Sequence, residues 1–153
     1  MKITDRLKVE HGVFLRQLKY VEQLLEHEAT RAVLAAAVET VAQAEAHHTM
    51  IEDRLLYPEL TKVFGKEFQP LVELAEDHAH IHRLVSVIRS GAFDEDDVHR
   101  FVDSLRVHLE KEIHQIFPLV EEILGPERLV SLSNWDAEHI LEGLPPGKPS
   151  PTV

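Results

Sequence analysis

The chain has 153 residues, 44% of them apolar, which is enough for one domain with a hydrophobic core. Its 27 acidic and 16 basic residues give a formal charge of −11, which argues against nucleic acid and anionic membranes as partners. Because cysteine is absent, a bound metal would need His, Asp or Glu ligands. No window approaches the roughly 18 apolar residues of a membrane span, and the N-terminus does not resemble a secretion signal. We therefore expect a soluble, cytoplasmic protein.

Two long helices are predicted in the first part of the chain. The first begins near Thr4 and Asp5, which we take as N-cap residues, and ends near Glu28. The second begins near Thr30 and ends near Pro58. One face of each helix combines apolar residues with a histidine at helical spacing. The residues on these faces are Leu7, His11, Leu15 and Leu18 in the first helix, and Leu34, Val41, His48 and Leu55 in the second.

Two further helices follow with the same kind of pattern. The third opens at Pro70 and ends at Ser90 and Gly91. The fourth opens at the acidic cluster 94–97, which is favourable at a helix N-terminus, and runs to Pro118. Their inward faces carry Leu74, His78, His82 and Val85 in the third helix, and Phe101, Leu105, His108 and Glu112 in the fourth.

Four helices of similar length joined by short loops predict an all-α fold, an up-down-up-down four-helix bundle. We assign the bundle to residues 1–125. Residues 126–153 should form a short helix, from about Glu127 to Glu142, and a Pro-rich tail that we expect to be disordered.

One motif occurs twice, in the second and fourth helices. His48 and Glu52 are followed by Pro58, and His108 and Glu112 are followed by Pro118, so each copy reads H-x3-E-x5-P. An acidic residue and a histidine also occur together in each of the other two helices, as Glu10-His11 and Asp77-His78. The first and second helices therefore look like a distant copy of the third and fourth.

The spacing suits metal binding, because residues four apart lie one turn apart on the same helix face. His78, His82 and His108 would bind one metal, and His11 and His48 the other, with Glu52 and Glu112 bridging the two. The first helix has Leu15 where the third has His82, so the metal bound by His11 and His48 would keep an open position for dioxygen, peroxide or nitric oxide.

A single His-x3-Glu pair is usually a solvated surface pair. Here six of these residues lie on stripes otherwise filled by Leu, Val and Phe, and burying them without cations would be prohibitive. They are His11, His48, Glu52, His78, His108 and Glu112. An inward His82 has a second reading, as a hydrogen-bonding neighbour. We expect His47 and His80 to neighbour the ligands or be exposed, and the remaining histidines to lie at the surface: His27, His99, His114 and His139.

On these residues, the chain resembles the hemerythrin family, specifically its bacterial single-domain, hemerythrin-like or HHE cation-binding members. The likeness spans about residues 5–120. The family's first-helix histidine corresponds to His11, its second-helix pair to His48 and Glu52, its third-helix pair to His78 and His82, and its last histidine to His108. The resemblance implies two non-haem iron ions joined by an oxo or hydroxo bridge and two carboxylates.

The fourth helix departs from the oxygen-carrying hemerythrins, which have His-x4-Asp there. The residue five after His108 is Ile113, and the carboxylate comes one residue earlier, as Glu112. This variant is typical of the hemerythrin-like branch, whose members are associated with oxygen, peroxide or nitric oxide chemistry and with iron handling.

Three functions remain open on this reading. The first is a di-iron protein that binds and decomposes small oxidants, with catalase-like breakdown of hydrogen peroxide as its enzymatic form. The second is binding or sensing of oxygen or nitric oxide without turnover, and the third is an iron buffer or a structural metal site, zinc included. The partner would be a diatomic or peroxide ligand, or a separate protein that receives the signal.

Overall fold

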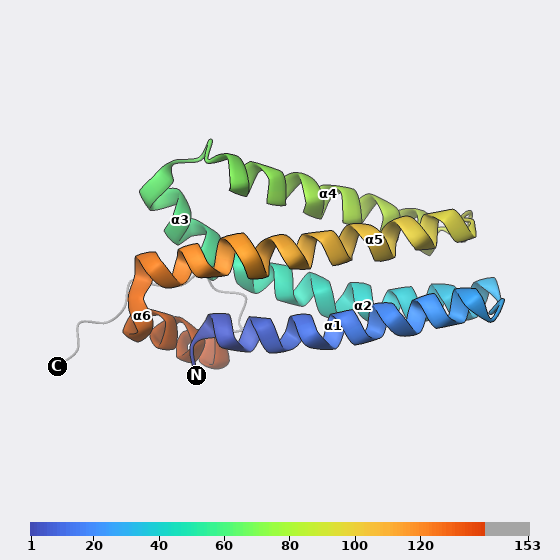
Figure 1. Cartoon of the computed structure of the whole chain (residues 1–153), viewed down its shortest axis with the longest axis horizontal. Coiled ribbons are helices and arrows are strands. Elements are labelled where there is room, and N and C mark those ends of the chain that lie inside the picture. The colour runs from blue at the N-terminus through green and yellow to red at the C-terminus, as the bar shows by residue number, and fades with distance from the viewer. Residues whose placement is uncertain (140–153) are drawn as a thin grey trace.

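The structure is a computed structural model that describes residues 1–139, and these residues form an all-helical bundle (Figure 1). Helices α1, α2, α4 and α5 run up, down, up and down, as predicted, while α3 and α6 extend from one end. Two π-helical segments join α2 to α3 and α5 to α6. The elements are α1 (Ile3–Glu26), α2 (Arg31–Ile51), a π-segment (Glu52–Leu56), α3 (Tyr57–Phe64), α4 (Gln69–Arg89), α5 (Glu95–Lys111), a π-segment (Glu112–Ile116) and α6 (Phe117–His139).

Two of the predicted helix starts are confirmed by capping hydrogen bonds. The Thr30 hydroxyl accepts from the Val33 N–H at 3.3 Å, and Asp94 and Asp97 form a reciprocal capping box at the start of α5. Helix α1 begins at Ile3, close to the predicted start, but the predicted N-cap was wrong: the N-cap is Lys2, and Thr4 lies fully buried inside the helix. A threonine whose side chain faces the core cannot cap the helix end.

The two predicted ends at Pro58 and Pro118 were also wrong, because the helical path continues through both prolines. Proline lacks an N–H and clashes with the carbonyl four residues earlier, so it interrupts a regular α-helix. Here a π-turn precedes each proline, with the Tyr57 N–H donating to the Glu52 carbonyl five residues back and the Phe117 N–H donating to the Glu112 carbonyl. The E-x5-P part of the repeat therefore marks a π-segment that begins at each glutamate.

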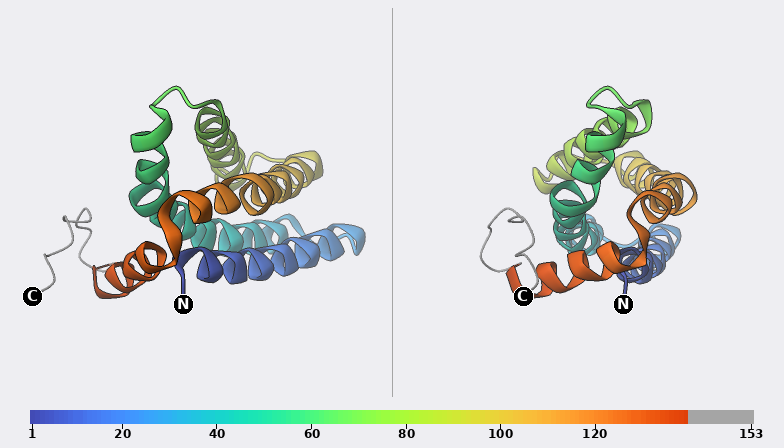
Figure 2. Two further views of the ribbon diagram at one scale, coloured as in Figure 1. Left: turned by 60° about the vertical axis from the view of Figure 1, so that its left-hand side comes forward. Right: turned by 90° about the vertical axis from the view of Figure 1, so that its left-hand side faces the viewer.

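Helix α6 bends sharply at Gly125, where φ is +70° and Pro126 follows. A left-handed φ suits glycine, and the bend turns the second half of α6 across the end of the bundle beside the start of α1 (Figure 2). The expected helix from Glu127 is present as far as His139, and its last three residues and the Pro-rich tail lie outside the described residues. The division into two segments at residue 125 coincides with this bend and stays a prediction.

The apolar core consists of two clusters with a polar layer between them. One cluster fills the end near the α1–α2 and α4–α5 loops and includes Phe14 and Phe101, while the other lies under α3 and α6 and includes Leu7 and Phe117. His11, fully buried, lies between Leu7 and Phe14 along α1 and so belongs to the polar layer. None of the helices in residues 1–139 is long and apolar enough to cross a membrane.

Candidate metal centre

Four histidine rings meet in the polar layer as two facing pairs, each joining two helices. The Nε2 atoms of His11 and His48 lie 2.9 Å apart, and those of His78 and His108 lie 3.0 Å apart. Two ligands bound at right angles to one metal ion, each about 2.1 Å from it, are separated by about 3 Å. Each pair of nitrogens thus has the spacing of two ligands to a common ion.

Two glutamates complete the arrangement from the first turn of each π-segment. Glu52 Oε1 lies 3.0 Å from His48 Nε2. Glu112 reaches both pairs, because its Oε2 lies 3.2 Å from His11 Nε2 and its Oε1 lies 3.2 Å from His108 Nε2. The residues form two groups that share both glutamates: His11, His48, Glu52 and Glu112 in one, and Glu52, His78, His108 and Glu112 in the other.

The nitrogen and oxygen atoms at this site are better satisfied by binding cations than by hydrogen bonds among themselves. Among the described residues, Glu52 Oε1 and Glu112 Oε2 are buried oxygens without a hydrogen-bond partner. A buried unsatisfied polar atom costs about 1–3 kcal/mol, and more when it is charged. Imidazole nitrogens and carboxylate oxygens bind iron, zinc and other first-row metals, so a pair of such ions would satisfy the whole set.

The pKa values show how strongly these groups act on each other. Burial alone would lower the pKa of His48, but the negative charge of Glu52 and a hydrogen bond to Glu10 raise it to about 10. Burial and the charge of Glu112 raise the pKa of Glu52 to about 8. Burial would raise the pKa of Glu112 as well, yet His108 and His11 hold it well below its ordinary value. The raised pKa values of His48 and His108 show that these rings compensate part of the buried negative charge when no cation is bound.

A carboxylate behind His48 fixes its ring. Glu10 Oε2 accepts from His48 Nδ1 at 2.7 Å, so the Nε2 of a neutral ring is left as an acceptor facing the site. Arg6 donates to Glu10 at 3.0 Å and also to Asp136, a buried residue of α6. This chain of contacts connects the bent end of α6 to a candidate metal ligand.

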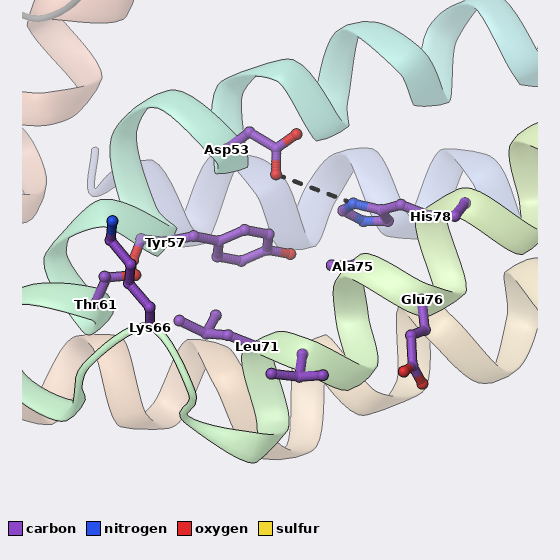
Figure 3. Close-up of a pocket in the computed structure, with 10 residues that line it drawn as sticks. Asp53, Tyr57, Thr61, Lys66, Leu71, Ala75, Glu76 and His78 are labelled. Carbon is purple, nitrogen blue, oxygen red and sulfur yellow. Dashed lines mark hydrogen bonds and ion pairs between the residues drawn. The ribbon is translucent and has the colours of Figure 1, made fainter.

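The second half of the repeat has looser support for its histidines. Asp77 Oδ2 lies 3.7 Å from His108 Nδ1 and accepts from Lys111 Nζ at 2.6 Å. Asp53 Oδ1 lies 4.0 Å from His78 Nδ1, across the space between α2 and α4 (Figure 3). The acidic residue before the histidine of one helix thus faces the histidine of the next helix in both halves. Glu10 faces His48, and Asp77 faces His108.

Tyr57 and Phe117 occupy matching positions in the repeat but differ in chemistry. The Tyr57 hydroxyl donates to Glu112 Oε1 and, at 3.3 Å, to Glu52 Oε2, while its ring packs on His78. Phe117 packs on His11 with ring centroids 5.1 Å apart and offers no donor. The sequence repeat aligned these two residues, yet only the structure shows that the hydroxyl reaches both glutamates.

Of the seven residues predicted to bind metal, the structure brings six together and leaves out His82. The His82 ring is exposed and lines a cavity between α2 and α4 instead of joining either group. Its role as a ligand stays a prediction without support from this geometry. His139 is half-buried against Trp135, and the other histidines outside the site are exposed: His27, His47, His80, His99 and His114.

Glu45 is a buried acidic residue that the sequence analysis did not identify. It lies one turn before Thr49 on α2 and accepts from the Thr49 hydroxyl at 2.8 Å. Burial raises its pKa. The repeat concealed this residue, because its counterpart in α5 is Leu105.

Comparison with known proteins supports the assignment to a family. Neither the curated proteins nor the solved structures include a significant match to this sequence. The family model described as the hemerythrin HHE cation-binding domain matches residues 2–120, which include all the helices that supply the histidines and glutamates of the site. The chain therefore belongs to the hemerythrin HHE cation-binding domain family.

Proposed function

We propose that this chain is a non-haem di-iron protein that binds small oxidants and decomposes hydrogen peroxide. The observation that carries the proposal is the orientation of Glu112, whose two oxygens face different histidine pairs. A carboxylate in this orientation is suited to bridge two ions, and Glu52 shares both groups with it. A closed structural site for one ion would not need two shared carboxylates.

Two iron ions bound by these residues, with an oxo or hydroxo bridge, would supply a two-electron reservoir. Decomposition of hydrogen peroxide needs such a reservoir, because one peroxide gains two electrons and two protons to give two waters, while a second loses the same number to give dioxygen. The protein's own groups would orient the reactants and move protons. Tyr57 places a hydroxyl group against both glutamates, and Glu10 holds the His48 ring.

Binding of dioxygen or nitric oxide without turnover is a second candidate. It is favoured by the apolar surroundings of the pair formed by His11 and His48, since the rings of Phe14 and Phe117 both pack near His11. A dry environment stabilises a bound diatomic ligand against hydrolysis and proton transfer. An iron-buffering role uses the same ligands but has no particular support from the geometry.

The proposal is tested by loading purified protein with iron and adding hydrogen peroxide. We expect dioxygen release in proportion to bound iron, and loss of release in His48→Ala. His47→Ala is the matched control, because His47 is exposed and should keep both iron and turnover. Reversible oxygen binding with no peroxide turnover would instead favour the second candidate.

A further inference from the structure

The two halves of the bundle, α1 with α2 and α4 with α5, meet along two interfaces that differ in packing. We call these interfaces seams. The repeat relates the seam between α2 and α4 to the seam between α5 and α1. On the second seam, α5 presents three apolar residues that are at least 99% buried, Val102, Leu105 and Leu109. At the corresponding positions α2 has Ala42, Glu45 and Thr49, which are smaller or polar.

A cavity of about 640 Å³ lies between α4 and α3, together with the π-segment that precedes α3. A cavity of about 400 Å³ lies between α2 and α4, and the replacement residues Ala42, Glu45 and Thr49 line it. Both are lined by Asp53, His78 and Ala79, so they meet beside one candidate metal ligand. Figure 3 shows Asp53 and Tyr57 on one side of the first cavity and His78 on the other.

The open side of the site is therefore the side of His78. Its side chain is 15% exposed, whereas those of His11, His48 and His108 are at most 1% exposed. From the sequence, we expect the open position at the metal bound by His11 and His48. The structure buries that pair among Phe14 and Phe117, because Phe rings fill the space at that end of the site.

Polar side chains lie among the apolar residues that line the two cavities. Glu45 and Thr49 project from α2 and His82 from α4 into the second cavity, and the Tyr57 hydroxyl faces the first. An apolar gas needs none of these groups. A small ligand with its own hydrogen-bond donors and acceptors would be matched by them.

We propose that the seam between α2 and α4 is the port and binding pocket through which a small hydrogen-bonding ligand reaches the metal pair from the side of His78, with Glu45 as its hydrogen-bond partner in the wall. This inference rests on the proposed function and narrows its substrate class, favouring hydrogen peroxide over a diatomic gas. The carboxyl of Glu45 suits the role, since it is buried in the cavity wall, where burial raises its pKa.

The port is tested with hydroxylamine, an uncharged isostere of hydrogen peroxide, on cobalt-loaded protein whose absorption spectrum reports ligand binding. Ala79→Trp places a bulky ring at the exposed residue where the two cavities meet. We expect its association rate to fall at least about tenfold while metal content is unchanged. Ala36→Trp, at another exposed alanine on α2, is the matched control and should bind at the wild-type rate.

Glu45 is tested with the same probe at equilibrium. Glu45→Leu copies its counterpart Leu105, and we expect it to weaken hydroxylamine binding about tenfold, which is the contribution of about one hydrogen bond. Glu45→Gln keeps donors and acceptors and should restore most of the affinity. Metal analysis of each variant separates loss of the ligand from loss of the ions.

Wild-type entry rates in Ala79→Trp, wild-type affinity in Glu45→Leu, or no binding of hydroxylamine to the unaltered protein would overturn the proposed port. Slower entry in Ala79→Trp and weaker binding in Glu45→Leu would support the port whether or not the protein decomposes peroxide. If the iron-loaded protein fails to decompose peroxide, the proposed catalytic function is refuted and the port is not. The two proposals can therefore fail separately.

Discussion

The two halves of the bundle supply equivalent ligands but support them differently. In the first half, Glu10 contacts His48 at 2.7 Å and is itself held by Arg6, whereas in the second half Asp77 lies 3.7 Å from His108. The buried pair that includes His11 has Phe117 beside it, while the more open pair that includes His78 has Tyr57. The duplicated motif thus repeats the candidate ligands, and the residues around them make the two histidine pairs unequal.

The largest expected effect comes from removing Glu112, the residue that contacts the histidine pairs of both halves. Glu112→Ala should prevent binding of both ions, because each histidine pair loses a carboxylate oxygen. Breaking such a buried charged cluster costs about 3–5 kcal/mol, so the melting temperature should fall as well. Metal analysis and thermal unfolding measure these two losses. Retention of both ions in Glu112→Ala would show that this residue does not bridge them.

The second prediction concerns the pH dependence of the metal-free protein. The folded-state pKa of His48 is raised from 6.5 to about 10, so its stabilising contribution is complete below about pH 6.5 and is lost as the pH rises through about 10. Each pKa unit corresponds to about 1.4 kcal/mol, and we expect a loss of a few kcal/mol over this range. Metal ions bind neutral imidazole, so their stabilising effect should grow over the same range and be lost on acidification. Urea unfolding with and without metal, from pH 6 to 10, tests this divergence, and parallel curves would contradict it.

The third prediction sharpens the difference between the two halves. Glu10→Ala should weaken metal binding about 10- to 100-fold, which is typical for loss of a carboxylate that orients a histidine ligand. Asp77→Ala should cost less, because its distance to His108 is longer. Competition with a chelator measures both affinities. Equal losses in the two variants would show that the halves are supported alike.

The smallest effect is expected from making the two halves more alike. Tyr57→Phe copies Phe117 and removes the hydroxyl that contacts Glu112 and Glu52. We expect full metal content, a shifted absorption spectrum of the loaded protein and a loss of about 1 kcal/mol in unfolding free energy. Phe117→Tyr tests the same comparison from the other half. An unchanged spectrum in Tyr57→Phe would mean that the hydroxyl does not act on the bridging carboxylates.

Helical periodicity and the repeat predicted the bundle and brought six site residues to one layer. They could not predict the π-segments, because a turn with i to i+5 hydrogen bonds has no apolar period of its own within five residues. Spacing also places His78 and His82 on one face of the helix, but it does not predict how deeply each ring is buried in the bundle. At the level of His82 the seam is hollow, so the ring lies at the surface.

Glu45 and Tyr57 show a second limit of the sequence. Both lie at positions where the two copies of the repeat differ, Glu45 against Leu105 and Tyr57 against Phe117. A search for matching residues finds the shared ligands and passes over the residues that break the symmetry. In this protein Glu45 lines the cavity between α2 and α4 and Tyr57 contacts Glu112, which is where the proposed chemistry would depend on them.

We propose that the two residue groups hold a pair of bridged iron ions. Anaerobic titration of the metal-free protein with ferrous iron, followed by X-ray absorption spectroscopy at the iron edge, tests it most directly. We predict saturation at two equivalents per chain and an iron–iron distance of about 3.5–4 Å, the spacing of two-metal sites. Saturation at one equivalent, or two equivalents without iron–iron scattering, would contradict the claim.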